Sequence, residues 1–132
     1  MVYEHELIST IESALNKDYQ IDREVPMIDK FIDIVAISKN PNEKEIIAIE
    51  VKIKNWKRAI QQAITYRLCA DKVYVAIWHE FRHRVDENVL DYFGIGLMEV
   101  NGTTQIVKTA RQSDKIHPAI RENIIGYVKG LE

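Results

Sequence analysis

The sequence predicts an α/β fold with a mixed β-sheet flanked by helices, and three observations support this class. Segments rich in β-branched residues alternate with segments of helical periodicity, as in folds that pack strands and helices in layers. Hydrophobic residues make up 46% of the chain and charged residues 29%, as in ordinary globular domains. The 132 residues can close one hydrophobic core, so residues 1–132 are expected to form a single domain.

The N-terminal segment predicts a helix and then a short strand. Residues 4–17 place Leu7 and Ile11 on one helical face. Residues 23–28 predict a strand that Pro26 confines to an edge or a strand end, because proline cannot donate to a ladder.

Two adjacent strands are expected next. Residues 31–37 and 45–53 are apolar and β-branched. The connecting segment 38–44 contains the Asn and Pro residues of a hairpin loop. These strands are therefore expected to pair antiparallel.

The middle of the chain predicts a helix and a buried strand. Asn55 can cap a helix at 56–70. Residues 72–78 are almost continuously apolar, as in a strand covered on both sides. A polar loop at 79–84 and a short helix within 85–93 follow.

The C-terminal part predicts a hairpin and a closing helix. Residues 94–100 and 103–110 flank Asn101-Gly102, a strong hairpin-turn signal. The final helix, 117–131, carries one apolar stripe of Ile120, Ile124, Tyr127, Val128 and Leu131. The expected order is therefore helix, three strands, helix, strand, helix, hairpin and helix.

The bulk properties narrow the functional classes. A net charge of −2 disfavours a protein that holds nucleic acid by positive charge alone, although it does not exclude an enzyme whose acidic site binds metal. No apolar stretch approaches the ~20 residues of a membrane helix, and residues 1–10 lack the basic and apolar regions expected of a secretory signal. The single cysteine, Cys69, is expected to be a buried packing residue and fits a cytoplasmic location.

Charged residues interrupt two of the apolar strands. Glu50 and Lys52 lie in the strand at 45–53, and residues two apart in a strand point to the same face. Asp33 interrupts the preceding strand. A hairpin closing through 38–44 is expected to bring Asp33 within a few residues of Glu50.

Two converging carboxylates repel each other, and each is costly to desolvate alone. A divalent cation would resolve this conflict, because Asp33, Glu50 and a backbone carbonyl, such as that of Val51, are hard ligands of the kind Mg²⁺ accepts. Lys52 would then orient or deprotonate a water and offset negative charge at phosphorus. The alternative is an ion-pair network of the three side chains that performs no chemistry.

The residues "IDIVAI" and "IAIEVK" resemble the PD-(D/E)xK nuclease superfamily, which has the restriction-endonuclease-like fold. They are particularly similar to its Holliday-junction resolvase branch of small endonucleases. In that superfamily, an Asp on one strand and E-x-K on the next lie within an αβββαβ core. The resemblance covers about residues 4–78 in element order, and Ile32 departs from it because many members carry Pro before the motif Asp.

The resemblance implies two further catalytic positions. Members often carry a Glu on the first helix, followed by apolar residues three, four and seven positions later, and Glu4 has this spacing. The alternative for Glu4 is a helix-terminal acid favoured by the dipole, and Glu12 is the reserve candidate. Many members also place a Gln on the helix after E-x-K, which Gln62 matches best. Asp29 is a fallback metal ligand for Asp33.

Several side chains near these positions are candidates for DNA contact. Lys54, Arg58 and Tyr66 lie on or before the second helix, and Arg82 and Arg84 follow the strand at 72–78. A solvated loop is the alternative for the two arginines.

These observations predict an endonuclease that hydrolyses DNA with Mg²⁺. Mn²⁺ is expected to substitute for Mg²⁺. The resemblance implies a cut that leaves a 5′-phosphate and a 3′-hydroxyl. Cleavage of both strands would require two sites, which favours a homodimer, and the modest acidity favours a more basic partner in a larger nucleic-acid-processing complex. The alternatives are a non-catalytic binding or assembly module on the same fold and an RNA-directed nuclease.

Overall fold

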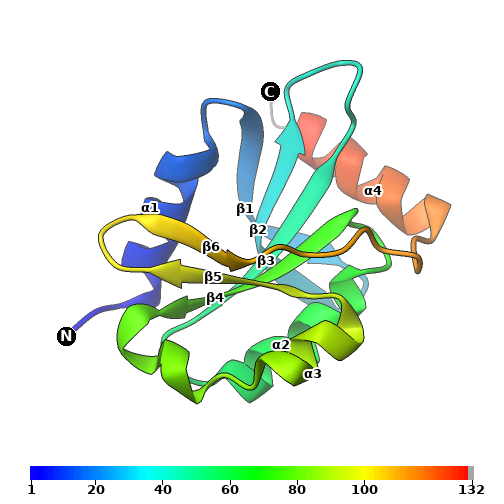
Figure 1. Cartoon of the computed structure of the whole chain (residues 1–132). Helices are drawn as coiled ribbons and strands as arrows, with labels where there is room; N and C mark the ends of the chain where they lie inside the picture. The colour runs from blue at the N-terminus through cyan, green and yellow to red at the C-terminus, as the bar shows by residue number, and fades with distance from the viewer. Residues whose placement is uncertain (131–132) are drawn as a thin grey trace.

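The computed structural model describes residues 1–130, and Leu131, expected in the stripe of the last helix, lies outside them. The elements are α1 (Glu4–Leu15), β1 (Tyr19–Met27), β2 (Lys30–Ser38), β3 (Ile46–Lys52), α2 (Trp56–Tyr66), β4 (Lys72–Trp78), the 3₁₀-helix η1 (His79–Arg84), α3 (Glu87–Phe93), β5 (Gly96–Val100), β6 (Thr104–Lys108) and α4 (Pro118–Lys129) (Figure 1). Across the described residues, no helix combines the length and apolar character that crossing a membrane requires.

All six strands belong to one sheet, in the order β1-β2-β3-β4-β5-β6. β1, β2 and β3 pair antiparallel, β3, β4 and β5 pair parallel, and β6 returns antiparallel to β5. α2 makes the crossover between β3 and β4, as parallel strands require. The predicted α/β class, the mixed sheet, the αβββαβ order and the C-terminal hairpin and helix are confirmed.

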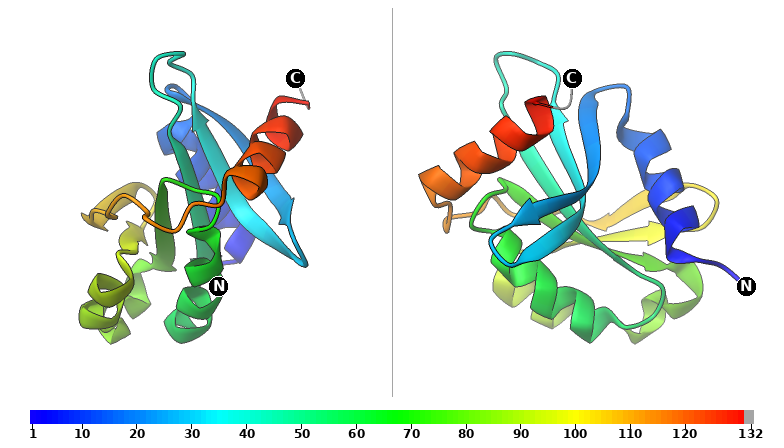
Figure 2. Two further views of the ribbon diagram at one scale, coloured as in Figure 1. Left: turned by 90° about the vertical axis from the view of Figure 1, so that its right-hand side faces the viewer. Right: turned by 180° about the vertical axis from the view of Figure 1, so that it is seen from behind.

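Helices cover both faces of the sheet, and each face has its own core (Figures 1 and 2). α1 packs Leu7 and Ile11 on one face, whereas α2, α3 and α4 contribute to the core on the other. Alternation along β3 places Ile46 and Ala48 in the core of the α2 face and the odd-numbered residues from 47 to 51 in the other. By this alternation the side chains of Glu50 and Lys52 belong to the α2 face.

Some element boundaries differ from the sequence prediction. β1 begins at Tyr19 rather than residue 23, because its first residues pair with the end of β2, where Tyr19 lies opposite Ser38. α2 ends at Tyr66 rather than residue 70. Residues 79–84, predicted as a loop, form η1. Local hydrophobic pattern does not encode these boundaries, which depend on pairing and packing with distant segments.

Candidate active site

Asp33, Glu50 and Lys52 come together where β2 and β3 part. At this end the last antiparallel pair between the strands is Ile34 with Ile49. Asp33 and Glu50 are the next residues on each strand beyond that pair. Asp33 Oδ2 accepts the backbone N–H of Val51 at 2.8 Å. Lys52 Nζ lies 3.9 Å from Glu50 Oε2. One part of the sheet therefore holds a buried glutamate beside a partly buried aspartate and lysine.

Glu50 is a buried acid, only 2% exposed. Burial and the negative charge of Asp33 raise the pKa of Glu50 to about 8, although the hydroxyl of Tyr66 and the charge of Lys52 act in the opposite direction. Burial also raises the pKa of Asp33, against the effect of the Val51 N–H and of Lys52. At neutral pH the two acids therefore hold a proton that a cation could replace.

The structure places Tyr66 differently from the prediction of a DNA contact. Its side chain is 1% exposed, and its hydroxyl is hydrogen-bonded to Glu50 Oε1. The carbonyl oxygen of Phe31 also lies 3.2 Å from this hydroxyl. Burial raises the pKa of Tyr66, so the phenol stays neutral. Tyr66 bonds to the Glu50 carboxyl group instead of facing solvent. Its burial could have been predicted from helical spacing, because Tyr66 follows Ala63 by three residues and so lies on the buried face of α2.

The acids Asp33 and Glu50 fit the ligand chemistry of a hard divalent cation. Both are carboxyl groups whose pKa burial raises, so a cation between them would relieve the cost of their charges. The N–H of Val51 bonds to Asp33, which brings its backbone to the site, and its carbonyl as a third ligand stays a prediction. Within residues 1–130, no group of three or more His, Cys, Asp or Glu side chains is placed to hold a metal. Waters and substrate phosphate would therefore complete the coordination of the cation.

A pocket of about 380 Å³ opens beside Tyr66. It is lined by residues of α2 and of the start of β2: Lys30, Phe31, Arg58, Gln61, Gln62 and Tyr66. Gln62 and Arg58, both predicted to act on the substrate, share this pocket with the tyrosine that contacts Glu50. The neighbouring Gln61, which helical geometry turns away from Gln62, also reaches the pocket.

Three acids considered from the sequence lie outside the cluster. Glu4 is exposed on α1, and that helix packs on the sheet face opposite α2. Glu12 accepts two hydrogen bonds from the guanidinium group of Arg23, at 2.7 and 2.6 Å. Asp29 lies in the turn between β1 and β2 rather than on a strand. A catalytic role for Glu4 remains a prediction, and in the described part of the chain no hydrogen bond or ion pair links Glu4 to the clustered residues.

The predicted cationic residues surround one edge of the sheet. Lys54 is exposed directly after β3, and Arg82 and Arg84 belong to η1, directly after β4. Because β3 and β4 are parallel, their C-terminal ends share this edge. Arg82 pairs with Glu99 at 3.8 Å, and the guanidinium group of Arg84 lies 4.8 Å from the ring of Phe81. Glu99 thus partly neutralises Arg82, while Lys54 and Arg84 remain exposed.

The fold has solved counterparts. It is similar to SPO1766, a protein of unknown function from Silicibacter pomeroyi, with a TM-score of 0.77 and 20% identity over 99% of this chain and 86% of that one. A repair endonuclease from Pyrococcus abyssi gives a TM-score of 0.45 with 12% identity, covering 77% of this chain and 49% of that one. SfsA from Pyrococcus furiosus in complex with Ca²⁺ gives 0.40 with 10% identity, covering 86% and 62%. No protein-family model and no curated protein matches the sequence. At these identities the first similarity establishes the fold alone.

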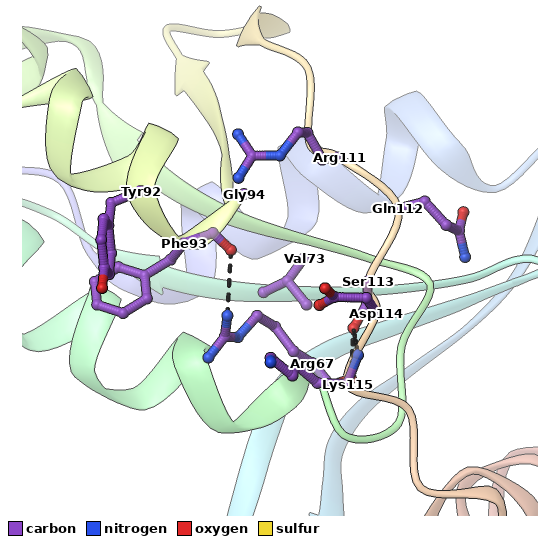
Figure 3. A pocket seen from close by; sticks show the side chains of 10 residues that line it. All are labelled: Arg67, Val73, Tyr92, Phe93, Gly94, Arg111, Gln112, Ser113, Asp114 and Lys115. Atoms are coloured by element: carbon purple, nitrogen blue, oxygen red, sulfur yellow. Dashed lines mark hydrogen bonds between the residues drawn. The ribbon is translucent and has the colours of Figure 1, made fainter.

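A larger pocket, of about 480 Å³, lies between the ends of α2 and α3 and the segment before α4 (Figure 3). Asp33, Glu50 and Lys52 do not line it. Arg67, Arg111 and Lys115 supply its positive charge, and Arg67 donates to the carbonyl groups of Ile64 and Phe93 at 3.0 and 3.5 Å. The three clustered side chains do not line the smaller pocket either, but its Tyr66 is hydrogen-bonded to Glu50, which no residue of the larger pocket is. The segment before α4 has no periodic pattern, so the larger pocket was not predictable from the sequence.

Proposed function

We propose that this chain is a metal-dependent endonuclease that hydrolyses phosphodiester bonds in DNA. The observation that carries the proposal is the cluster of Asp33, Glu50 and Lys52 where the pairing of β2 with β3 ends, joined through Tyr66 to an open pocket. Paired carboxylates and a lysine are groups that phosphodiester hydrolysis with a divalent cation uses. The resemblance of the sequence to the PD-(D/E)xK nucleases implies the same three residues.

Each residue of the cluster has a role in this proposal. Asp33 and Glu50 would hold Mg²⁺ or Mn²⁺, which when bound supplies Lewis-acid stabilisation of the charge developing on the phosphate. Lys52 orients the attacking water and balances negative charge. Tyr66 fixes the Glu50 carboxyl group, and Gln62 donates from the pocket to the water or to the phosphate.

The proposed reaction is an in-line displacement. A water oxygen bonds to phosphorus and releases one proton to solvent, the bond from phosphorus to the 3′ oxygen breaks, and that oxygen takes up one proton from solvent. The products implied by the resemblance are a 5′-phosphate and a 3′-hydroxyl. Cutting both strands takes two sites, so we propose a homodimer. The net charge of −2 favours a more basic partner in a larger complex as an aid to DNA binding.

The test is cleavage of supercoiled plasmid, linear duplex, flap and four-way-junction DNA with Mg²⁺ or Mn²⁺. Lys52→Ala is expected to lower the cleavage rate about 100-fold or more, the scale of removing one charge-stabilising group. Its far-UV circular dichroism should match the parent. Lys44→Ala is the matched control, because Lys44 is an exposed lysine in the loop at the other end of β3. Cleavage that persists in EDTA or in Asp33→Ala would refute the proposal.

One observation favours a second candidate, a non-catalytic nucleic-acid-binding or assembly module. Glu50 is already hydrogen-bonded by Tyr66, and with a pKa of about 8 it is largely uncharged at neutral pH, as in a self-sufficient structural network. This candidate requires DNA or RNA binding without cleavage in either metal. Faster cutting of RNA than of DNA in the same assay would instead identify an RNA-directed nuclease.

A further inference from the structure

The turn between β1 and β2 exposes two large apolar side chains. Ile28 is 73% exposed and Phe31 is 64% exposed. The two strands meet at the Met27–Lys30 pair, so the turn has only two residues. Figure 2 shows this hairpin projecting from the edge of the sheet, with its turn beside α2 in the right-hand view.

The backbone at this turn is strained. Ile28 has a φ of 60°, in the left-handed region that β-branched residues avoid. Two-residue hairpin turns normally place Gly, Asn or Asp at such a position. The exposed side chain of Ile28 gains little from burial, so the core does not compensate for the strain. Strain that folding does not explain is a recognised feature of functional positions.

The same hairpin adjoins the candidate active site. The carbonyl oxygen of Phe31 lies 3.2 Å from the hydroxyl of Tyr66, and that hydroxyl bonds to Glu50. Phe31 and Lys30 also line the pocket that contains Gln62. Along β2, Phe31 precedes Asp33 by two residues, a separation of about 7 Å. Phe31 therefore lies at the pocket, and Ile28 lies in the adjoining turn.

The surroundings of the tip suit nucleic acid better than a protein partner. Lys30 and Arg58 line the pocket and form no ion pair with a carboxylate of residues 1–130, which leaves them available for phosphates. Asp29 is the one acid in the turn. Two exposed apolar side chains are far short of the ~800 Å² per partner of a stable protein interface. They are enough to stack on or enter between bases, as apolar wedges of DNA-binding proteins do.

We propose that Ile28 and Phe31 form a wedge that stacks against bases beside the cleaved bond. The preferred substrate is then DNA whose bases are unpaired or easily opened at the cut, such as a junction between single and double strands. This inference rests on the proposed nuclease function and adds the substrate class to it.

The test uses DNA with 2-aminopurine at a single-strand to double-strand junction and a continuous duplex with the same base at its centre. Binding of the parent in Ca²⁺ is expected to raise the fluorescence at the junction, which reports unstacking. In Mg²⁺, Phe31→Ala should cut the junction on the order of tenfold more slowly, the loss expected for one base–aromatic stack. The rate on continuous duplex should change much less.

Ile28→Gly separates function from folding. Glycine suits a positive φ, so this variant should unfold at a higher temperature than the parent. Its fluorescence increase should fall at least about twofold, because part of the stacking surface is lost. Ile106→Ala is the matched control, because Ile106 is an exposed apolar residue on β6 at the opposite edge of the sheet. It should leave both readouts unchanged.

The outcomes distinguish this inference from the nuclease proposal. A parent protein that cuts no DNA would overturn both. A parent that cuts DNA, with Phe31→Ala slowing junction and duplex equally or not at all, would overturn the wedge alone. A dimer in the parent that becomes a monomer in Phe31→Ala by sedimentation, with an unchanged cleavage preference, would also overturn it and make the tip an interface between two copies.

Discussion

Glu50 shows at the scale of one residue how the fold creates a reactive group. Its usual pKa is 4.5, and in the folded chain it rises to about 8 because the side chain is buried and Asp33 lies nearby. Tyr66 and Lys52 offset only part of this cost. The folded protein therefore retains a proton at neutral pH, and a divalent cation would compete for the same oxygen atoms.

The raised pKa of Glu50 predicts a pH-dependent stability. The folded state binds more protons than the unfolded state between pH 4.5 and about 8, so the associated stability is complete below that range and is lost as pH rises through it. The pKa of Asp33 is raised as well and adds an effect of the same sign. Urea denaturation in EDTA is expected to show the unfolding free energy falling by a few kcal/mol, of the order set by such a shift, from about pH 5 to about pH 9.

Glu50→Gln identifies the group responsible, because glutamine keeps the shape of the side chain and cannot titrate. The variant should lose most of this pH dependence and be more stable than the parent at the alkaline end. Glu122→Gln, which removes an exposed acid of α4, should retain the slope of the parent. An unchanged slope in Glu50→Gln would assign the pH dependence to another residue.

At the scale of elements, the pairing of β2 with β3 was predictable because it depends on residues that are close together in the sequence. Alternation placed Glu50 and Lys52 on one face, and the short hairpin loop placed Asp33 beside them. The partner of Glu50 was not predictable in the same way. Tyr66 reaches it across 16 residues through the crossover of α2, and only the packing of that helix on the sheet fixes the contact. The distance of Glu4 from the site likewise depends on which face of the sheet α1 covers. The periodicity of the sequence does not indicate that face.

Asp71 links three elements that are distant in sequence. Its Oδ2 accepts from the backbone N–H of Ile46 at 2.7 Å and from Arg121 Nη1 at 2.9 Å, and its Oδ1 accepts from Gln112 at 3.0 Å. Asp71→Asn keeps the size but removes the charge and one acceptor, so the unfolding free energy should fall by about 2–3 kcal/mol in urea denaturation. Asp114→Asn, an exposed acid of the neighbouring loop, should cost less than about 0.5 kcal/mol. Equal stabilities of the two variants would show that Asp71 does not anchor α4.

At the scale of the whole molecule, the sheet divides the interior into two cores, and the site lies where the pairing of β2 with β3 ends, between these cores. Ile47, Ile49 and Val51 anchor β3 in the core below α1, while Ile46 and Ala48 anchor it in the core that contains Tyr66. The hairpin places the two acids near each other, and the two cores hold β3 in position. In the unfolded chain, 16 intervening residues separate Asp33 from Glu50 and leave no preformed ligand pair.

A cation that binds between Asp33 and Glu50 would therefore stabilise the whole folded chain. At a free concentration about 100 times its Kd, Mn²⁺ should add about 2.7 kcal/mol to the unfolding free energy. The cation must displace the proton of Glu50, so this gain should be larger at about pH 8.5 than at about pH 6.5. Urea denaturation with Mn²⁺ and with EDTA at both pH values measures it. Asp33→Asn should lose most of the gain, whereas Glu45→Gln, an acid just before β3 that pairs with Lys72, should retain it. Equal gains in the parent and Asp33→Asn would place the cation elsewhere on the molecule, and a larger gain at the lower pH would mean that it does not compete with the Glu50 proton.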